Sequence, residues 1–374
     1  MRGHITQRTK DNKTWSVVIE LNKINGKRKQ KWYTVHGDKK DAEKFLTEKL
    51  RELDTGMFID IISITVSDYF KYWVEECCIP NQSPTTYESY QKNINLHINP
   101  IIGDIKLKDL LPLHLQTLYS NRLKFGLSKT TVLYLHRIIH SALEQAMKWQ
   151  LIPRNIADNV EPPKRNKFVA QVLDSSQITE LIKIAKETDI YIPIMIAIST
   201  GMRRGEILGL TWDNVDFNNN TIKIIKALYN TKNGLVFLEP KTIKSKRIIN
   251  IPPTLCNILK EHKQKQEFLK NALQNEYKDN NLVCCIENGS PFNPDSFTPK
   301  FRKLLDSSNL PKIRFHDLRH SHASLLLSQG VQPKFISERL GHSNINITMD
   351  LYSHIYEATN KEIANNFDIF LKTS

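Results

Sequence analysis

The sequence predicts a multidomain protein that is mainly helical and contains two small β regions. Three observations lead to this fold class. The 374 residues exceed the usual size of one domain, so two or three domains are expected. Apolar residues mostly recur at helical spacing, whereas strong β-formers gather near 15–35 and in short runs between 221 and 251. The segment 161–167, with two prolines and three basic residues, predicts a stiff linker.

Residues 1–57 are expected to form a small β-sheet closed by one helix. The β-formers of 15–21 predict a strand, 22–26 a turn, and 32–35 a continuation in extended conformation. A helix is expected over 38–53, because apolar residues recur there at helical spacing. These residues are Ala42, Phe45, Leu46, Leu50 and Leu53.

Positive charge is concentrated in this first segment. The chain has 53 Lys and Arg against 39 Asp and Glu, a net charge of +14, and residues 1–53 hold 14 basic against 7 acidic residues. Half of the excess therefore lies there, which favours a polyanion partner. Basic residues at a hairpin suit a β-ribbon in a DNA groove; alternatively, they only keep a sheet edge soluble. The predicted DNA-contacting residues are Lys27, Arg28, Lys29 and Lys31.

Residues 62–162 are expected to form a bundle of four helices. Thr65 with Asp68 predicts the N-terminal cap of the first helix. Ser83, followed by proline, predicts the start of a second helix over 85–96.

The third and fourth helices are expected to begin at Pro112 and Ser128, and the chain leaves the bundle near Pro153. The fourth helix is the longest, and its apolar side chains form one stripe. The stripe consists of Leu135, Ile138, Ile139, Ala142, Ala146 and Trp149. In the linker that follows, Lys164 and Arg165 are further expected DNA contacts.

Residues 168–374 are expected to be a third unit, in which helices alternate with a short β region. Asp174 predicts the cap of its first helix. The expected strands are 221–227, 235–238 and 246–251.

Composition excludes several classes of protein. No apolar run is long enough for a membrane span, and the N-terminus lacks the apolar stretch of a signal peptide. Cysteines at 77, 78, 256, 284 and 285 have neither zinc spacing nor a plausible disulfide framework, so they are expected to be reduced core thiols. We expect no metal, no cofactor and no membrane partner. The expected location is the bacterial cytoplasm, in association with the nucleoid.

The last third of the chain holds polar residues that would suit attack on a phosphodiester without a metal. This reaction needs an oxygen nucleophile, positive charge on the phosphoryl oxygens, a group that removes the nucleophile's proton, and an acid for the leaving oxygen. Arginine can supply the charge, because its planar fork of donors matches two phosphate oxygens.

Two arginines are candidates for this role. Arg203 is expected at a helix start, and Glu206 lies three residues on, where it could hold the guanidinium. His316 and Arg319 are three apart on an expected helix, so they point the same way. Each pair alone is more often an ordinary structural feature.

Tyr352 lies ten residues after His342, in a stretch with helical pattern. Tyrosine, with a pKa of about 10 in solution, is a poor nucleophile at neutral pH unless cations favour the phenolate. Two arginines and two histidines converging on one site would provide that environment.

These motifs together resemble those of the tyrosine recombinases, the phage-integrase family. The resemblance covers roughly 192–355 and depends on four motifs in a fixed order. They are Thr-Gly-Met-Arg at 200–203, His-Asp-Leu-Arg-His-Ser-His-Ala-Ser at 316–324, Leu-Gly-His-Ser at 340–343 and Tyr-Ser-His at 352–354.

The resemblance implies a role for each residue. Tyr352 would be the nucleophile that forms a 3′-phosphotyrosine link and frees a 5′-hydroxyl. Arg203 and Arg319 would clamp the scissile phosphate, His316 would assist proton removal, and His342 would hydrogen-bond a phosphoryl oxygen. One departure is that the gap from His342 to Tyr352 is one residue longer than in many members, which leaves Tyr356 as a competitor.

The family also uses a lysine on a β-hairpin as the acid for the 5′-oxygen. Lys241 matches that place, and Lys244 and Lys246 are close enough to remain alternatives. Glu206 matches a supporting acidic position.

The resemblance further implies a site-specific recombinase that integrates and excises a mobile genetic element, either a phage or a conjugative transposon. Residues 1–57 would be an arm-type DNA-binding domain, 62–162 a core-DNA-binding domain and 168–374 the catalytic domain. The partners would be double-stranded DNA at core and arm sites, three further copies in a homotetramer, and accessory DNA-bending or excision proteins. An apolar stripe of Ile363, Phe367 and Phe370 would pack on its own domain or dock onto a neighbouring copy.

Two other functions remain open on the sequence. A topoisomerase would use the same chemistry, although the basic N-terminal unit favours a recombinase with a second DNA site. A non-enzymatic DNA-binding regulator would not need the full set of reactive residues.

Overall fold

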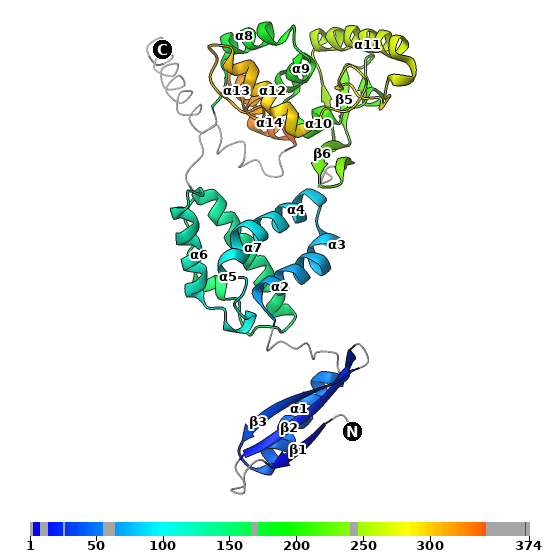
Figure 1. Ribbon diagram of the computed structural model, residues 1–374. Coiled ribbons are helices and arrows are strands. Elements are labelled where there is room, and N and C mark those ends of the chain that lie inside the picture. Colours follow the sequence, from blue (N-terminus) through cyan, green and yellow to red (C-terminus); the bar gives the residue numbers. More distant parts are fainter. Residues whose placement is uncertain are drawn as a thin grey trace. The chain divides into compact units, whose positions relative to one another are not determined.

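The computed structural model describes residues 3–7, 14–24, 27–54, 64–165, 171–239, 246–341 and 371. For 21–24, 27–29, 31 and 51–54 it describes the backbone alone. The chain divides into two compact units, residues 1–166 and 167–374 (Figure 1), and each is described by itself.

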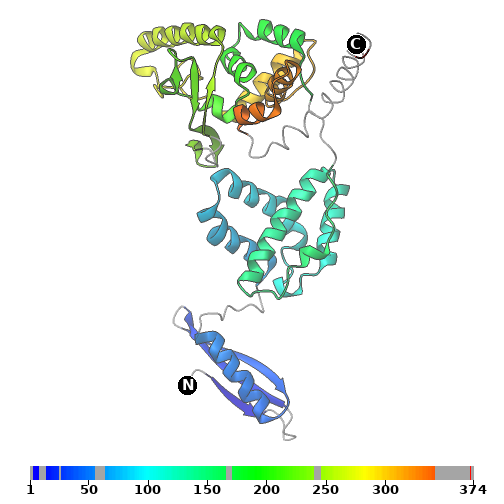
Figure 2. The same cartoon turned by 180° about the vertical axis from the view of Figure 1, so that it is seen from behind.

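The first unit begins with an antiparallel sheet in the order β1-β2-β3. The strands are β1 (Gly3–Gln7), β2 (Thr14–Ile24) and β3 (Lys27–His36), and helix α1 (Lys39–Asp54) follows. Alternate residues of β2, Trp15, Val17 and Ile19, are buried against α1 together with Ala42 of that helix. Figures 1 and 2 show α1 lying across one face of the sheet. The expected hairpin and helix are confirmed; β1 was not predicted.

A second core in the same unit is entirely helical. Its main helices are α2 (Val66–Trp73), α4 (Pro84–Asn93), α6 (Pro112–Lys124) and α7 (Lys129–Lys148). Thr65 and Ser128 cap α2 and α7, because each hydroxyl accepts a backbone N–H three residues on, at 3.1 Å. Ser83 occupies the cap position of α4, but its hydroxyl bonds to other hydroxyls and not to a backbone N–H. The predicted stripe of α7 is buried except for Trp149, which is partly exposed.

Two π turns extend the first two helices, the second of them beyond its predicted end. Val74–Cys78 carries α2 into α3 (Ile79–Asn81), and Ile94–Ile98 carries α4 into α5 (Asn99–Ile102). In both, a proline comes two residues after the end of the π turn, and its ring would clash with the carbonyl four residues earlier in an α-helix. The wider turn lets the N–H before that proline bond five residues back, to Val74 O and Ile94 O. The prediction that the second helix ends at 96 was therefore wrong.

The helical core ends just before the basic linker. A short 3₁₀ turn, Ile156–Asn159, and Val160 complete this core. Lys164 and Arg165 are exposed in irregular backbone.

The second unit combines helices with two small sheets. Its principal helices are α8 (Ser175–Ala185), α9 (Tyr191–Thr200), α10 (Arg204–Leu208), α11 (Pro253–Leu273), α12 (Pro294–Asp306), α13 (Asp317–Ser328) and α14 (Pro333–Leu340). The strands are β4 (Val215–Asp216), β5 (Thr221–Ile224), β6 (Ala227–Thr231), β7 (Gly234–Leu238) and β8 (Arg247–Asn250). Asp174 caps α8 as predicted, bonding the N–H of Gln177 at 2.9 Å.

The sheets have the orders β4-β5-β8 and β6-β7. The single strand predicted over 221–227 is in fact two strands, β5 and β6, which pair with different partners. The alternation of apolar and polar residues changes phase at this break, because Ile224 and Ile225 are both apolar, and the prediction did not use that signal. The strands expected at 235–238 and 246–251 correspond to β7 and β8, and the fold class as a whole is confirmed.

Within the described ranges, no helix is long and apolar enough to cross a membrane. All five cysteines are free, and Cys78, Cys256 and Cys284 are buried as expected of core thiols.

Gly201 joins three helices of the second unit. It ends α9 in the left-handed conformation, with φ at +66°. A Cβ at this position would overlap the side chain of Leu340 at the end of α14 and lie 2.8 Å from Cδ2 of His322 on α13. Only glycine allows the three helices to approach this closely.

His322 holds the same three helices together through its ring nitrogens. Nδ1 lies 2.7 Å from Ile198 O, and Nε2 lies 3.1 Å from Nε of Arg339. Arginine can only donate, so Nε2 accepts and Nδ1–H donates, which is the neutral ring. Arg339 also donates to Ser199 O at 3.0 Å. Burial, together with the charge of Arg339, lowers the pKa of His322 to about 4.

We therefore expect acid to loosen the contacts among α9, α13 and α14. The pKa of a histidine in the unfolded chain is about 6.5, so the unfolded state binds more protons than the folded one between about pH 6.5 and 4. The stability contributed by His322 is complete above this window and is lost as the pH falls through it, by about 3 kcal/mol. Hydrogen–deuterium exchange of amides in α9 and α13, corrected for intrinsic rates, measures the loss.

His322→Gln is the matched variant, because its amide can donate and accept but does not titrate. Its exchange protection should change less with pH than that of the wild type. Equal pH dependence in the two proteins would contradict the assignment of the neutral ring.

Candidate active site

A buried carboxylate, Glu206, lies between two arginines. Its side chain is 4 % exposed, and its oxygens lie 2.8 Å from Arg203 Nη1 and 2.9 Å from Arg247 Nη2. It also accepts the backbone N–H of Arg203 at 2.9 Å, which closes the first turn of α10. Burial alone would raise the pKa of Glu206, but hydrogen bonding and charge from Arg247, with the charge of Arg203, bring it below its usual value. The carboxylate is therefore ionised at neutral pH.

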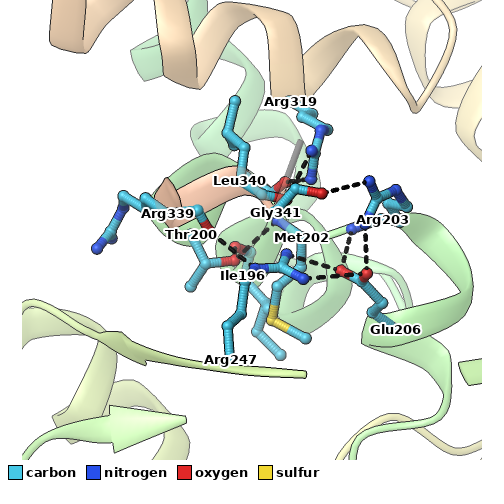
Figure 3. Close-up of polar contacts among 11 residues, drawn as sticks. Ile196, Thr200, Met202, Arg203, Glu206, Arg247, Arg319, Arg339, Leu340 and Gly341 are labelled. Atoms are coloured by element: carbon cyan, nitrogen blue, oxygen red, sulfur yellow. Dashed lines mark hydrogen bonds and ion pairs between the residues drawn. The ribbon is translucent and has the colours of Figure 1, made fainter. Parts of the chain in front are cut away.

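Three arginines donate to three consecutive carbonyls at the end of α14 (Figure 3). Arg247 Nε bonds Arg339 O at 2.8 Å, Arg319 Nη2 bonds Leu340 O at 2.7 Å, and Arg203 Nη2 bonds Gly341 O at 3.0 Å. Carbonyls at a helix end have no partner within the helix and carry its negative dipole end, so cations stabilise them. These bonds fix the chain at the residue before His342.

Gly341 lets the chain turn away from α14 at this point. Its φ is +66°, the left-handed region, and a Cβ would lie 3.1 Å from Arg247 Nη1. Gly341 is thus both the residue at which α14 ends and a residue that lies against Arg247.

Arg319 is the most buried of the three arginines, with 2 % of its surface exposed. It also donates to Gly201 O at 2.8 Å, so one guanidinium joins the ends of α9 and α14. Arg203 is more accessible, with 38 % of its side chain exposed. Of the two predicted clamp residues, Arg203 is therefore the more exposed.

His316 precedes α13 and lies one turn before Arg319. An ion pair of Arg314 with Asp317, at 2.7 Å, closes this turn. Burial, then the nearby His320 and Arg319, lower the pKa of His316 to about 4. His316 is exposed, so solvent screens part of this effect. The positive charges of Arg319 and Arg203 are sufficient to lower the pKa of His316. A neutral imidazole can accept a proton.

The structure thus brings together four of the predicted residues: Arg203, Glu206, His316 and Arg319. His342 and Tyr352 lie outside the described residues, as do Lys241 and Lys244. The remaining lysine alternative, Lys246, is exposed and forms an ion pair with Glu239 at 2.7 Å. The side chains of Lys27, Arg28, Lys29 and Lys31 are likewise not described.

Sequence reasoning missed Arg247. The one signal available was its place two residues before Ile249 on β8, because alternate strand residues share a face. Ile249 is buried, and Arg247, with 8 % of its side chain exposed, faces inward too.

The chemical character of this site is cationic. Arg203 and Arg247 flank the carboxylate of Glu206, and Arg319 donates to the neighbouring carbonyl of Leu340. Where the structure describes side chains, no three His, Cys, Asp or Glu residues gather in a way that could hold a metal ion. Fixed guanidinium groups beside a neutral imidazole suit a phosphate ester.

Solved structures with the same fold are integrases. The Tn1549 transposon integrase in complex with transposon right end DNA matches with a TM-score of 0.69 and 21 % identity, over 81 % of this chain and 99 % of that one. A lambda integrase tetramer bound to a Holliday junction matches with a TM-score of 0.59 and 14 % identity, over 93 % and 94 %.

Related sequences include a "Tyrosine recombinase XerC-like" protein of Caldanaerobacter subterraneus subsp. tengcongensis. It is 25 % identical over 336 residues, which cover 85 % of this chain and 86 % of the relative. The "ICEBs1 integrase" of Bacillus subtilis is 26 % identical over 329 residues, or 87 % of each.

Two family models match the chain in the order expected from its architecture. The N-terminal SAM-like domain of phage integrases matches residues 65–124. The model of the phage integrase family matches residues 171–359, which include Arg203, Arg319 and Tyr352. The chain therefore belongs to the phage integrase family, the tyrosine recombinases that its motifs predicted.

Proposed function

We propose that this recombinase cuts and rejoins DNA at specific sites through Tyr352, and so integrates and excises a mobile genetic element. The observation that carries the proposal is the convergence of Arg203 and Arg319, 116 residues apart, on the carbonyls of Leu340 and Gly341. Both arginines thus lie at the residue before His342.

In the proposed first step, the Tyr352 oxygen attacks phosphorus and the bond to the 5′-oxygen breaks. Arg203 and Arg319 stabilise the charge on the phosphoryl oxygens. Their bonds to protein carbonyls and to Glu206 support this role, since they hold the guanidinium groups in place before DNA arrives.

Two proton transfers complete that step. His316, neutral because its pKa is lowered, takes the proton of Tyr352. Lys241 gives a proton to the departing 5′-oxygen, with Lys244 and Lys246 as the alternatives. His342 donates a hydrogen bond to a phosphoryl oxygen. Rejoining reverses these transfers, and the phosphotyrosine keeps the bond energy, so neither metal nor nucleotide is needed.

We assign three domains to three tasks. Residues 1–57 bind arm-type DNA, with Lys27, Arg28, Lys29 and Lys31 as contacts, residues 62–162 bind the core site, and residues 168–374 carry out the chemistry. Lys164 and Arg165 are exposed in the linker between the last two domains, where they contact the DNA backbone. By likeness to the DNA-bound Tn1549 and lambda integrases, four copies act together on two DNA duplexes. The reaction takes place in the bacterial cytoplasm, at the nucleoid. Accessory DNA-bending or excision proteins take part in it.

Tyr352→Phe should retain DNA binding but lose covalent attachment to DNA, because phenylalanine has no nucleophilic oxygen. The substrate is a suicide duplex with the junction sequence of the circular element. Denaturing gels detect attachment and peptide mapping identifies the tyrosine. Tyr356→Phe is the matched control and should attach normally.

A covalent complex formed by Tyr352→Phe would refute the assignment of the nucleophile. Loss of attachment by wild-type protein in chelator would refute the metal-free mechanism. Relaxation of plasmids without strand exchange would favour a topoisomerase.

Arg203→Ala and Arg319→Ala should each slow cleavage by on the order of 10²-fold or more, by analogy with the loss of one charge-stabilising donor. Arg204→Gln is the control, since Arg204 is also half-buried on α10 but donates to Pro294 O, at 2.9 Å. Single-turnover cleavage with saturating enzyme measures the rates, and thermal unfolding checks the fold. Cleavage by the Arg203 variant at nearly the wild-type rate would exclude it from the clamp.

Replacing Lys27, Arg28, Lys29 and Lys31 by glutamine should weaken binding to arm DNA and flatten its salt dependence. Each lost phosphate contact reduces the slope of log K against log salt by about 0.9. Titrations at several salt concentrations, with a fragment of the element's end that includes the arm sites, measure the slope. Deletion of residues 1–57 gives the limiting value. A slope unchanged by the deletion would contradict an arm-binding role.

A further inference from the structure

We propose that Arg247 is a positioning residue of the recombination site, which ties the arginine clamp to the end of α14 and to strand β8. This inference rests on the proposed function, because its effect is measured on DNA cleavage. Arg247 itself touches no reacting atom; it acts through Glu206, Arg203 and the backbone before His342.

The geometry of Arg247 joins elements that are far apart in sequence. Its two terminal nitrogens reach both oxygens of Glu206, at 3.2 and 2.9 Å, and its Nε donates to Arg339 O at 2.8 Å. The two terminal nitrogens of one guanidinium thus bond the carboxylate on α10, and its third nitrogen bonds the end of α14 (Figure 3). Lysine could supply the charge but not this three-way fork.

Arg247 also begins β8, the strand that follows the segment with Lys241. The pairing of β8 with β5 fixes its register, with Arg247 opposite Ile224. Movement of Arg247 would therefore move the start of β8, Glu206 and the α14 end together.

The ionisation of Glu206 depends on Arg247. Among the residues that the structure describes, three titratable groups face its carboxylate: Arg203 from the N-cap of α10, Arg247 from β8 and Tyr229 from β6. Tyr229 brings no positive charge, so within this described set the two arginines offset the cost of burial. Hydrogen bonding by Arg247 is the largest of the effects that lower the pKa of Glu206.

Without Arg247, the pKa of Glu206 rises, because burial continues to disfavour the carboxylate. A protonated Glu206 holds the Arg203 guanidinium less well, which loosens the clamp on the phosphate. Loss of Arg247 should therefore make cleavage sensitive to acid, and should affect the rate of cleavage more than the affinity for DNA.

The test compares Arg247→Gln with Arg247→Lys and with the control Arg204→Gln. Single-turnover covalent attachment to the suicide duplex is measured from about pH 5.5 to about 9, with DNA affinity measured in parallel. We expect Arg247→Gln to lose on the order of 10²-fold in rate near pH 6 and clearly less near pH 8.5. DNA affinity should change by no more than about threefold.

Arg247→Lys should restore the wild-type shape of the pH profile, because it keeps the charge beside Glu206. Its rate should stay about tenfold below wild type, since the bond to Arg339 O is lost. Arg204→Gln should have wild-type rate and profile. Glu206→Gln removes the titrating group, so adding Arg247→Gln to it should create no new acid sensitivity.

Three outcomes would overturn the proposal. They are a wild-type profile for Arg247→Gln, a loss that is equal at every pH, and a lysine variant with the same profile as the glutamine variant. Tyr352→Phe, assayed in parallel, separates the two levels of inference. If that variant still attaches to DNA, the proposed function fails; if it does not, the outcomes above bear on Arg247 alone.

Discussion

The ion pair of Glu206 with Arg203 and Arg247 is the interaction on which the rest of the second unit's site depends. A buried carboxylate is stable only where cations and donors surround it, and removing one partner from such a group typically costs about 3–5 kcal/mol. The two arginines bound to Glu206 also hold the carbonyls of Arg339 and Gly341. The carboxylate therefore sets the positions of both guanidinium groups, and these in turn set the path of the chain as it leaves α14.

The guanidinium groups are held by protein oxygens and not left to find DNA by themselves. Arg319 donates hydrogen bonds to Gly201 O and Leu340 O and is almost fully buried. An arginine fixed in this way loses little side-chain freedom when a phosphate binds, which is an advantage for stabilising a short-lived charge. Gly201 makes this possible, because its missing side chain lets α9 approach α13 and α14.

Much of this was predictable from the sequence, for local reasons. Thr65, Ser128 and Asp174 predict helix starts, because a cap depends on hydrogen bonds to residues only three positions away. The family motifs locate four residues of the site: Arg203, Glu206, His316 and Arg319. The π turns were not predictable from apolar spacing, since the sequence pattern before Pro80 and Pro100 resembles that of an ordinary helix. Arg247 was missed because its partners, Glu206 and Arg339, lie 41 and 92 residues away and no local pattern points to them.

The three carbonyls at the end of α14 also determine where the chain can change length during evolution. Each residue inserted into α14 would rotate its last turn by about 100° and remove all three carbonyls from their arginines together. An insertion or deletion within α14 would therefore be selected against for as long as the three contacts are needed. The arginines thus fix the length of this helix as well as its position.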